Sequence, residues 1–389
     1  MTGELGRSCA SGYTQSTRRR VEQFSLRVAI VCSWLNQYGG AERVLEVVHA
    51  MYPEAPVYTS LFWPQALPPG YRDWDLRFSF LNRVPLIHRH HRWFLPLYPY
   101  AFEQFDFSDY DLVLSVTSAF AHGVVTSPKT LHICYCLTPA RFLWDYHAYV
   151  AREGLGRVVR FLLPLFVYNL RLWDRLAADR VDHFVAISRA VQRRIQKFYQ
   201  READIIHPPI DAHRFPLAQE PGDFFLIASR LVPYKRIDLA VEAFNRLGLP
   251  LWIIGDGRDR RALQAAAGPN VHFLGHVSDD QLSDHLRRCR AFIFPGEEDF
   301  GIAPLEAQAA GRPVIAYAAG GALDTVIEGT TGLFFREPTP ESLAAAVMRL
   351  DGIRFDAAAI RQHALRFDQS AFRSRFADFV QARFEEFSS

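Results

Sequence analysis

The sequence predicts an α/β fold built from two doubly wound, parallel-sheet domains. Short apolar runs of strand length recur along the 389 residues, and a helical or turn segment follows each of them. The series stops once, at Pro208-Pro209 and the polar stretch 219–222, and then begins again. Two such series separated by one break are typical of two doubly wound domains joined by a hinge.

The first series spans residues 24–214. A strand is predicted at residues 28–32, followed by a loop with a glycine pair and a helix over residues 41–51. Further strands are predicted at residues 112–116, 131–136 and 184–188. The polar residues 1–23 show no periodicity, and we expect them to form a disordered arm.

The second series spans residues 222–365. Its strands are predicted at residues 224–228, 251–254, 271–274, 291–294 and 313–316. Residues 366–389 carry apolar side chains at a spacing of three to four, namely Phe372, Phe376, Phe379, Val380 and Phe384. This pattern predicts an amphipathic helix that packs back across the hinge.

Composition and charge narrow the class of protein. At 49% apolar and 14% aromatic residues, the chain is expected to be globular. Its five cysteines form no Cys-x-x-Cys pair, and no apolar run approaches the roughly 20 residues that span a bilayer. We therefore expect a cytoplasmic protein without disulfides, a zinc site or a membrane span. Residues 1–214 carry 25 basic against 19 acidic side chains, which indicates an anionic partner for the first domain.

Two carboxylates eight positions apart follow the predicted strand at residues 291–294. Glu298 lies on the loop after this strand, and Glu306 lies in a short helix that has Pro304 near its start and ends before Gly311. Ligands of open α/β sheets bind at this edge, and the free amides of a helix start favour anions. Carboxylates accept hydrogen bonds from sugar and ribose hydroxyls, so the motif suits a sugar nucleotide. The alternative is an exposed acidic loop.

Arg230 and Lys235 follow the predicted strand at residues 224–228. They lie five positions apart across a proline turn, where both can converge on one diphosphate. The alternative is a solvated basic turn. The glycines of Gly39-Gly40 and Gly255-Asp256-Gly257 follow two other strands, where they either bring backbone amides close to a ligand or only turn the chain.

Taken together, these segments resemble the family-four retaining glycosyltransferases. The resemblance covers roughly residues 27–340 and rests on Gly39-Gly-Ala-Glu-Arg43, Pro208-Pro-Ile-Asp211, Ser229-Arg-Leu-Val-Pro-Tyr-Lys235, Gly255-Asp-Gly257, Phe273-Leu-Gly-His-Val277, Glu298 to Glu306 and Ala319-Gly-Gly-Ala322. It implies the GT-B architecture, in which two Rossmann-like domains face each other across a cleft that holds the site, and a C-terminal helix crosses back to the N-terminal domain.

The resemblance also implies roles for the matching residues. Arg230 and Lys235 would hold the leaving diphosphate, and Glu298 would bind the transferred sugar; these three would be the catalytic residues. Glu306 would bind the ribose hydroxyls, and the rest of the donor site would be Gly39, Gly40, Gly255, Gly257, Gly275, Val277, Phe300, Gly301 and Ile302. The anomeric configuration would be retained, and neither a metal nor another cofactor would be required.

One position departs from the family pattern. Residues 135–145 resemble bacterial mannosyltransferases that act on lipid-linked polysaccharide precursors, in which a histidine commonly stands at the position of Leu137. A leucine side chain can neither hydrogen-bond a sugar hydroxyl nor accept a proton. His132 and His147 lie near it in the sequence, but we expect both to be structural.

The resemblance implies transfer of a hexose, mannose from GDP-mannose, to a lipid-linked saccharide in cell-surface polysaccharide assembly. Leu137 motivates an alternative, a non-catalytic partner subunit that binds the nucleotide sugar. A sugar-nucleotide epimerase or a phosphorylase with the same architecture is disfavoured by the Glu298/Glu306 pair and by the lack of an obvious cofactor lysine.

Two segments of the first domain, residues 83–98 and 157–173, mix arginines with aromatic side chains. Such a mixture suits an anionic membrane surface, which predicts a peripheral protein on the inner face of the plasma membrane. A buried aromatic cluster with exposed charges is the alternative. Nucleic acid is not expected as a partner, because the net charge is only +2 and no binding motif is present.

Overall fold

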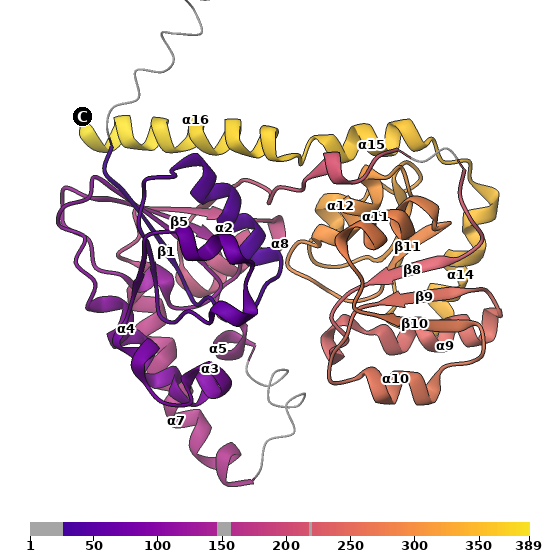
Figure 1. Ribbon diagram of the computed structural model, residues 1–389, viewed down its shortest axis with the longest axis horizontal. Coiled ribbons are helices and arrows are strands. Elements are labelled where there is room, and N and C mark those ends of the chain that lie inside the picture. Colours follow the sequence, from indigo (N-terminus) through magenta and orange to yellow (C-terminus); the bar gives the residue numbers. More distant parts are fainter. Residues whose placement is uncertain (1–25, 146–156, 218–219) are drawn as a thin grey trace, which may run out of the picture.

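Two α/β lobes lie side by side in the computed structural model, which describes residues 26–145, 157–217 and 220–389. Figure 1 shows a sheet with helices on both faces in each lobe, with the N-terminal domain in indigo to pink and the C-terminal domain largely in orange. The predicted arm at residues 1–23 lies outside the described residues. The two domains expected from the break near Pro208-Pro209 are thus present.

The N-terminal sheet is parallel throughout. Its strands are β1 (Val28–Cys32), β2 (Val57–Thr59), β3 (Leu76–Phe78), β4 (Leu112–Thr117), β5 (Leu131–Cys136), β6 (His183–Ala186) and β7 (Ala203–Ile205). Its α-helices are α2 (Gly40–Met51), α3 (Ile87–His90), α4 (Tyr98–Glu103), α5 (Arg141–Trp144), α7 (Arg157–Ala178) and α8 (Arg189–Arg194). The strand order is β3-β2-β1-β4-β5-β6-β7, so the direction of winding reverses between β1 and β4.

The C-terminal sheet is also parallel. Its strands are β8 (Phe225–Ala228), β9 (Leu251–Ile254), β10 (Val271–Gly275), β11 (Ala291–Phe294), β12 (Val314–Tyr317) and β13 (Gly332–Phe335). Its helices are α9 (Ile237–Leu247), α10 (Arg260–Ala266), α11 (Asp279–Arg288), α12 (Ile302–Ala309), α13 (Ala322–Thr325), α14 (Pro340–Arg349) and α15 (Ala357–Leu365). The order β10-β9-β8-β11-β12-β13 reverses between β8 and β11, and ligands of such sheets bind at the carboxyl ends of the strands at this point.

The last helix, α16 (Gln369–Ser388), returns to the N-terminal domain and runs along it (Figure 1). The Asp368 side chain caps its start by accepting from the amide of Ser370. Phe372 and Phe376 are buried, and their rings meet the ring of Tyr135 on β5 edge-on, at 5.7 and 5.8 Å between centroids. The predicted crossover helix is therefore confirmed.

Every strand that the sequence predicted is present, within one or two residues at its ends. The prediction missed β2, β3, β7 and β13, which are three or four residues long and have no extended apolar run. Their pairing is set by neighbouring strands rather than by their own residues. The four described cysteines are free and buried.

Candidate active site

The predicted site residues lie where the winding of each sheet reverses. Gly39-Gly40 follows β1, Arg230 follows β8, and Glu298 follows β11. The two sheet edges face each other, because a side-chain carbon at Gly40 would lie 3.1 Å from Cδ1 of Ile302, the first residue of α12. The crevices of the two domains therefore form one site.

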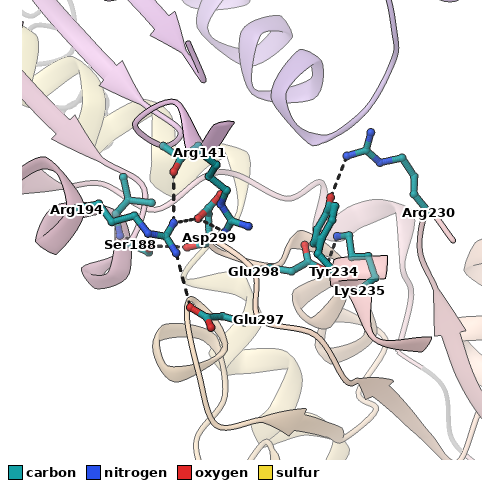
Figure 2. Close-up of polar contacts among 11 residues, drawn as sticks. Arg141, Ser188, Arg194, Arg230, Tyr234, Lys235, Glu297, Glu298 and Asp299 are labelled. Atoms are coloured by element: carbon teal, nitrogen blue, oxygen red, sulfur yellow. Dashed lines mark hydrogen bonds and ion pairs between the residues drawn. The ribbon is translucent and has the colours of Figure 1, made fainter. Parts of the chain in front are cut away.

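Two of the three predicted catalytic residues are in direct contact. The Lys235 ammonium forms an ion pair with Glu298 Oε1, and both side chains are less than one-fifth exposed (Figure 2). The ring of Tyr234 lies between Lys235 and Arg230: the Lys235 Nζ is 5.3 Å from the ring centre, and Arg230 donates to the Tyr234 hydroxyl at 3.2 Å. Arg230 also reaches Gln37 of the N-terminal domain at 3.5 Å. No pattern in the sequence predicted that Tyr234 bridges the two cations.

Glu306 meets an arginine from the opposite domain. It is buried on α12, and Arg43 Nη1 on α2 lies 2.9 Å from its Oε1. Burial raises the pKa of the Glu306 carboxyl, and the charge of Arg43 opposes that shift. Asp279 approaches Arg43 to 3.8 Å and Arg214 to 2.5 Å. Arg43 was visible in the motif that begins at Gly39, but only the fold shows that it lies beside Glu306.

Close backbone contacts explain several of the glycines. Gly255 has a φ of +123°, and a side chain there would lie 1.9 Å from the carbonyl oxygen of Ser229. A side chain at Gly321 would lie 2.2 Å from the Cα of Phe300, and the Gly321 amide donates to the Glu298 carbonyl at 2.9 Å. The Gly320-Gly321 pair thus holds the loop that carries Glu298. The other predicted donor residues, Gly257, Gly275, Val277 and Gly301, lie just after or at the ends of β9, β10 and β11.

Phe300 connects this loop to the hinge. Its side chain is buried, and its ring stacks on His207 with 5.3 Å between ring centroids. His207 is held in turn, because its Nδ1 donates to the carbonyl of Ile187 at 2.9 Å. The Phe300 side chain therefore anchors the loop.

Asp299 is clamped by the N-terminal domain. Arg141 on α5 and Arg194 on α8 both form ion pairs with Asp299 Oδ1, and the Ser188 hydroxyl donates to the Asp299 carbonyl at 2.5 Å (Figure 2). Arg194 also lies 3.7 Å from Glu297. We call these contacts the Asp299 clamp; they fix the residue next to Glu298 from across the domain boundary. Arg141 falls in the segment 135–145, but the sequence did not indicate its partner.

The contacts of Leu137 are structural, and they explain neither a gained nor a lost catalytic role for this position. It follows β5, its amide donates to the Thr117 carbonyl at 2.8 Å, and its side chain packs partly buried against the core. His132 lies at the opposite end of β5, about 16 Å away at 3.3 Å per residue. It is buried with Nε2 2.8 Å from Ser115 Oγ, and burial lowers its pKa to about 3. His132 is therefore structural, and His147 lies outside the described residues.

The basic and aromatic segments at residues 83–98 and 157–173 contain both buried aromatic side chains and exposed ones. Tyr98 is fully buried, whereas Trp93 is 71% exposed and stacks on His90. On α7 the exposed apolar side chains are Leu165, Phe166, Tyr168, Leu172 and Leu176. The two segments lie at the same end of the N-terminal domain (Figure 1), where the Trp173 indole donates to Glu103 of α4 at 2.8 Å. The side chains of residues 157–162 lie outside the description.

Among residues 26–145, 157–217 and 220–389, no group of three or more His, Cys, Asp or Glu side chains is arranged to hold a metal ion. No helix in this part of the chain combines the length and the apolar character needed to cross a bilayer.

Comparison with known proteins places these features in a family context. Residues 210–353 match the family model of glycosyl transferases group 1. An uncharacterized glycosyltransferase of Methanocaldococcus jannaschii is 25% identical over 187 residues, which are 46% of this chain and 52% of that protein. A GDP-mannose-dependent alpha-mannosyltransferase of Corynebacterium glutamicum is 35% identical over 131 residues, 32% of this chain and 31% of that one. The aligned part thus spans about half or less of these curated relatives.

The fold of the whole chain is shared with solved structures. Anabaena HepE, in complex with UDP, superimposes with a TM-score of 0.67 at 16% identity, and the match covers 91% of this chain and all of that one. Two parallel-sheet domains and a crossover helix, together with this likeness, make this a GT-B fold. The chain is therefore a GT-B protein whose residues 210–353 carry the sequence pattern of the group 1 glycosyl transferases.

Proposed function

We propose that this chain is a retaining hexosyltransferase that moves mannose from GDP-mannose to a lipid-linked saccharide during cell-surface polysaccharide assembly. The observation that carries the proposal is the pairing of both motif carboxylates with cations at the reversal point of the C-terminal sheet. Glu298 pairs with Lys235, and Glu306 pairs with Arg43. Each pair offers a carboxylate for hydroxyl groups beside a cation for phosphate.

The proposed chemistry uses preorganised charge. Lys235 and Arg230 would stabilise the charge that develops on the departing diphosphate, together with the free amides at the start of α12. A phosphoryl oxygen of the leaving group would accept the proton of the attacking hydroxyl, on the face of the sugar that the diphosphate leaves. The anomeric configuration is then retained, and neither a protein base nor a metal ion is required.

The Lys235–Glu298 pair would change partners when the donor binds. A diphosphate carries more negative charge than the single carboxylate of Glu298, and its oxygens form charge-assisted hydrogen bonds, so Lys235 would turn to the diphosphate. Glu298 would then accept hydrogen bonds from the sugar hydroxyls. The Asp299 clamp supports this exchange, because it holds the next residue of the chain in place while the side chain of Glu298 changes partner.

The choice of mannose and GDP rests on the Corynebacterium relative, whose name specifies a GDP-mannose-dependent mannosyltransferase, and on the segment 135–145. The lipid-linked acceptor and a place on the anionic inner face of the plasma membrane are supported by the exposed apolar side chains of α7 and by Trp93. The alternative of a non-catalytic partner subunit has no structural observation in its favour.

The test is donor turnover. The purified protein is incubated with GDP-mannose or UDP-glucose and a bacterial lipid extract, and released nucleotide and glycolipid are measured. We expect GDP release, a mannosylated lipid whose anomeric proton reports an α linkage, and the same rate with EDTA. Turnover of UDP-glucose but not of GDP-mannose would show that the donor is not GDP-mannose. Absence of turnover with both donors, despite tight nucleotide binding, would favour the non-catalytic alternative.

A further inference from the structure

Glu42 is a buried carboxyl group with no role in the mechanism above. It is the third residue of α2, immediately after Gly40-Ala41, and it is only 5% exposed. Its Oε2 atom has no hydrogen-bond partner within the described part of the chain, and a side-chain carbon at Gly39 would lie 3.5 Å from it. A buried polar atom without a partner lowers the stability of the fold. This oxygen therefore lies at the start of α2, beside the glycine pair, at a cost in stability.

The groups around Glu42 come from four elements. Glu46 lies one turn further along α2, and Cys32 is at the end of β1. Tyr71, from the one-turn helix at Pro69–Asp73, donates its hydroxyl to the Glu42 carbonyl at 3.1 Å. Arg230 of the C-terminal domain is the cation whose charge lowers the pKa of the Glu42 carboxyl. Glu42 forms no ion pair with any of the described residues.

The opposing effects of these surroundings bring the pKa of the Glu42 carboxyl close to neutral pH. Burial raises the pKa of Glu42 to about 7, while the backbone amides of Glu42 and Gly39 and the charge of Arg230 act in the opposite direction. Because Oε2 has no hydrogen-bond partner among the described residues, it is the oxygen that can carry the proton in the neutral form.

We propose that Glu42 binds the diphosphate of the donor as a neutral carboxylic acid, donating a hydrogen bond from Oε2 to a phosphoryl oxygen. The proposal rests on the proposed function, because that function puts the diphosphate between Gly39-Gly40 and Arg230. An ionised carboxylate at this position would repel the diphosphate, whereas the neutral acid supplies one O–H donor. The atom that lacks a partner in the free protein gains one from the ligand.

Proton uptake follows from this arrangement. Above pH 7 the free protein carries Glu42 mostly ionised, so each bound diphosphate must take one proton from the solvent. Because the pKa of the free protein is about 7 and the bound ligand raises it further, affinity falls as pH rises above 7. The fall is up to about tenfold per pH unit, the limit for uptake of one proton. The terminal phosphate of a nucleotide titrates near pH 6, below this range.

Titration calorimetry between pH 7 and 9, in two buffers of different ionisation enthalpy, tests the proposal. The probe is GDP or UDP, whichever wild type binds more tightly. At pH 8 wild type should take up about one proton per bound nucleotide. Glu42→Gln supplies an amide donor at every pH, so it should take up none and should bind about tenfold or more tightly than wild type at pH 9. A side chain with only a structural role would not produce this gain.

Glu46→Gln is the matched control. Glu46 lies on the same helix and is a half-buried carboxyl, whereas Glu42 is buried; the Glu46 Oε2 accepts from the Tyr38 hydroxyl at 3.1 Å. This variant should show the proton uptake of wild type. Nucleotide binding by wild type without proton uptake, or weaker binding by Glu42→Gln at pH 9, would overturn the proposal and leave the proposed function standing. No binding of either nucleotide by wild type would overturn both.

Discussion

Replacing Glu306 by alanine should weaken the binding of a nucleoside diphosphate about ten- to a hundredfold. The Glu306 side chain is 9% exposed, and its ion pair with Arg43 uses Oε1, so that a ribose hydroxyl can donate to Oε2. Loss of a charged hydrogen-bond partner costs roughly 1.5–3 kcal/mol, and each 1.4 kcal/mol is about tenfold in Kd. The sugar-binding carboxylate, Glu298, remains in this variant.

The structure also predicts what the arginine contributes. Arg43→Ala leaves Glu306 buried without its cation, so the free energy of unfolding should fall by about 1–3 kcal/mol. The double variant Arg43→Ala/Glu306→Ala no longer buries an uncompensated charge, and its loss of stability should be smaller than the sum of the two single losses. The ion pair and the ribose contact can then be separated by measuring stability and nucleotide affinity for all three variants.

Calorimetry with GDP at pH 7.5 measures the affinity, and circular dichroism checks that each variant is folded. Glu297→Ala is the matched control, since the Glu297 side chain is 53% exposed on the loop that precedes α12 and its loss should leave the Kd unchanged. A folded Glu306→Ala variant that binds GDP and UDP with the affinities of wild type would refute the ribose assignment.

Four further predictions concern the reaction and its location. Glu298→Gln should abolish most sugar transfer in a turnover assay while GDP affinity stays near that of wild type; a matching loss of GDP affinity would contradict the assignment of Glu298 to the sugar. Lys235→Ala should lower kcat by about two to three orders of magnitude, as removal of one preorganised donor does, and an unchanged kcat would show that Lys235 does not touch the leaving group. Sedimentation with anionic liposomes should exceed sedimentation with neutral ones and fall as salt rises, and Arg89→Ala/Trp93→Ala should reduce it; equal sedimentation with both vesicles would exclude an electrostatic membrane face. Leu137→His should leave transfer nearly unchanged and cost about 1–3 kcal/mol of stability, because it places a polar ring in the apolar surroundings of a partly buried side chain; an inactive wild type rescued by this substitution would support the non-catalytic alternative.

The sequence was sufficient for the elements that carry the site, because each of them has a strong local pattern. Buried parallel strands such as Ala291–Phe294 are continuous apolar runs, and the glycines after them mark the loops. In the structure Arg230 and Lys235 follow β8 and Glu298 follows β11, the two neighbouring strands at which the winding reverses, while the roles of these residues stay predictions.

The contacts between the domains could not be predicted in this way. Arg43 and Glu306 are 263 residues apart, and Arg141 and Asp299 are 158 apart. Neither separation leaves a periodic or local pattern, since these side chains meet only where the two domains pack against each other. The state of Glu42 was hidden for the same reason: its burial depends on packing against β1 and the helix at Pro69–Asp73, which only the fold reveals.

The Asp299 clamp limits how freely the two domains can be exchanged between related proteins. A recombinant that joined this C-terminal domain to a foreign N-terminal domain would keep Asp299 but would lose Arg141, Arg194 and Ser188 unless the donor of that domain had them too. The carboxylate would then lie at the boundary without a cation, one residue away from Glu298. Changes on the outer surface of the N-terminal domain therefore disturb the loop that carries Glu298 less than replacement of the domain as a unit does.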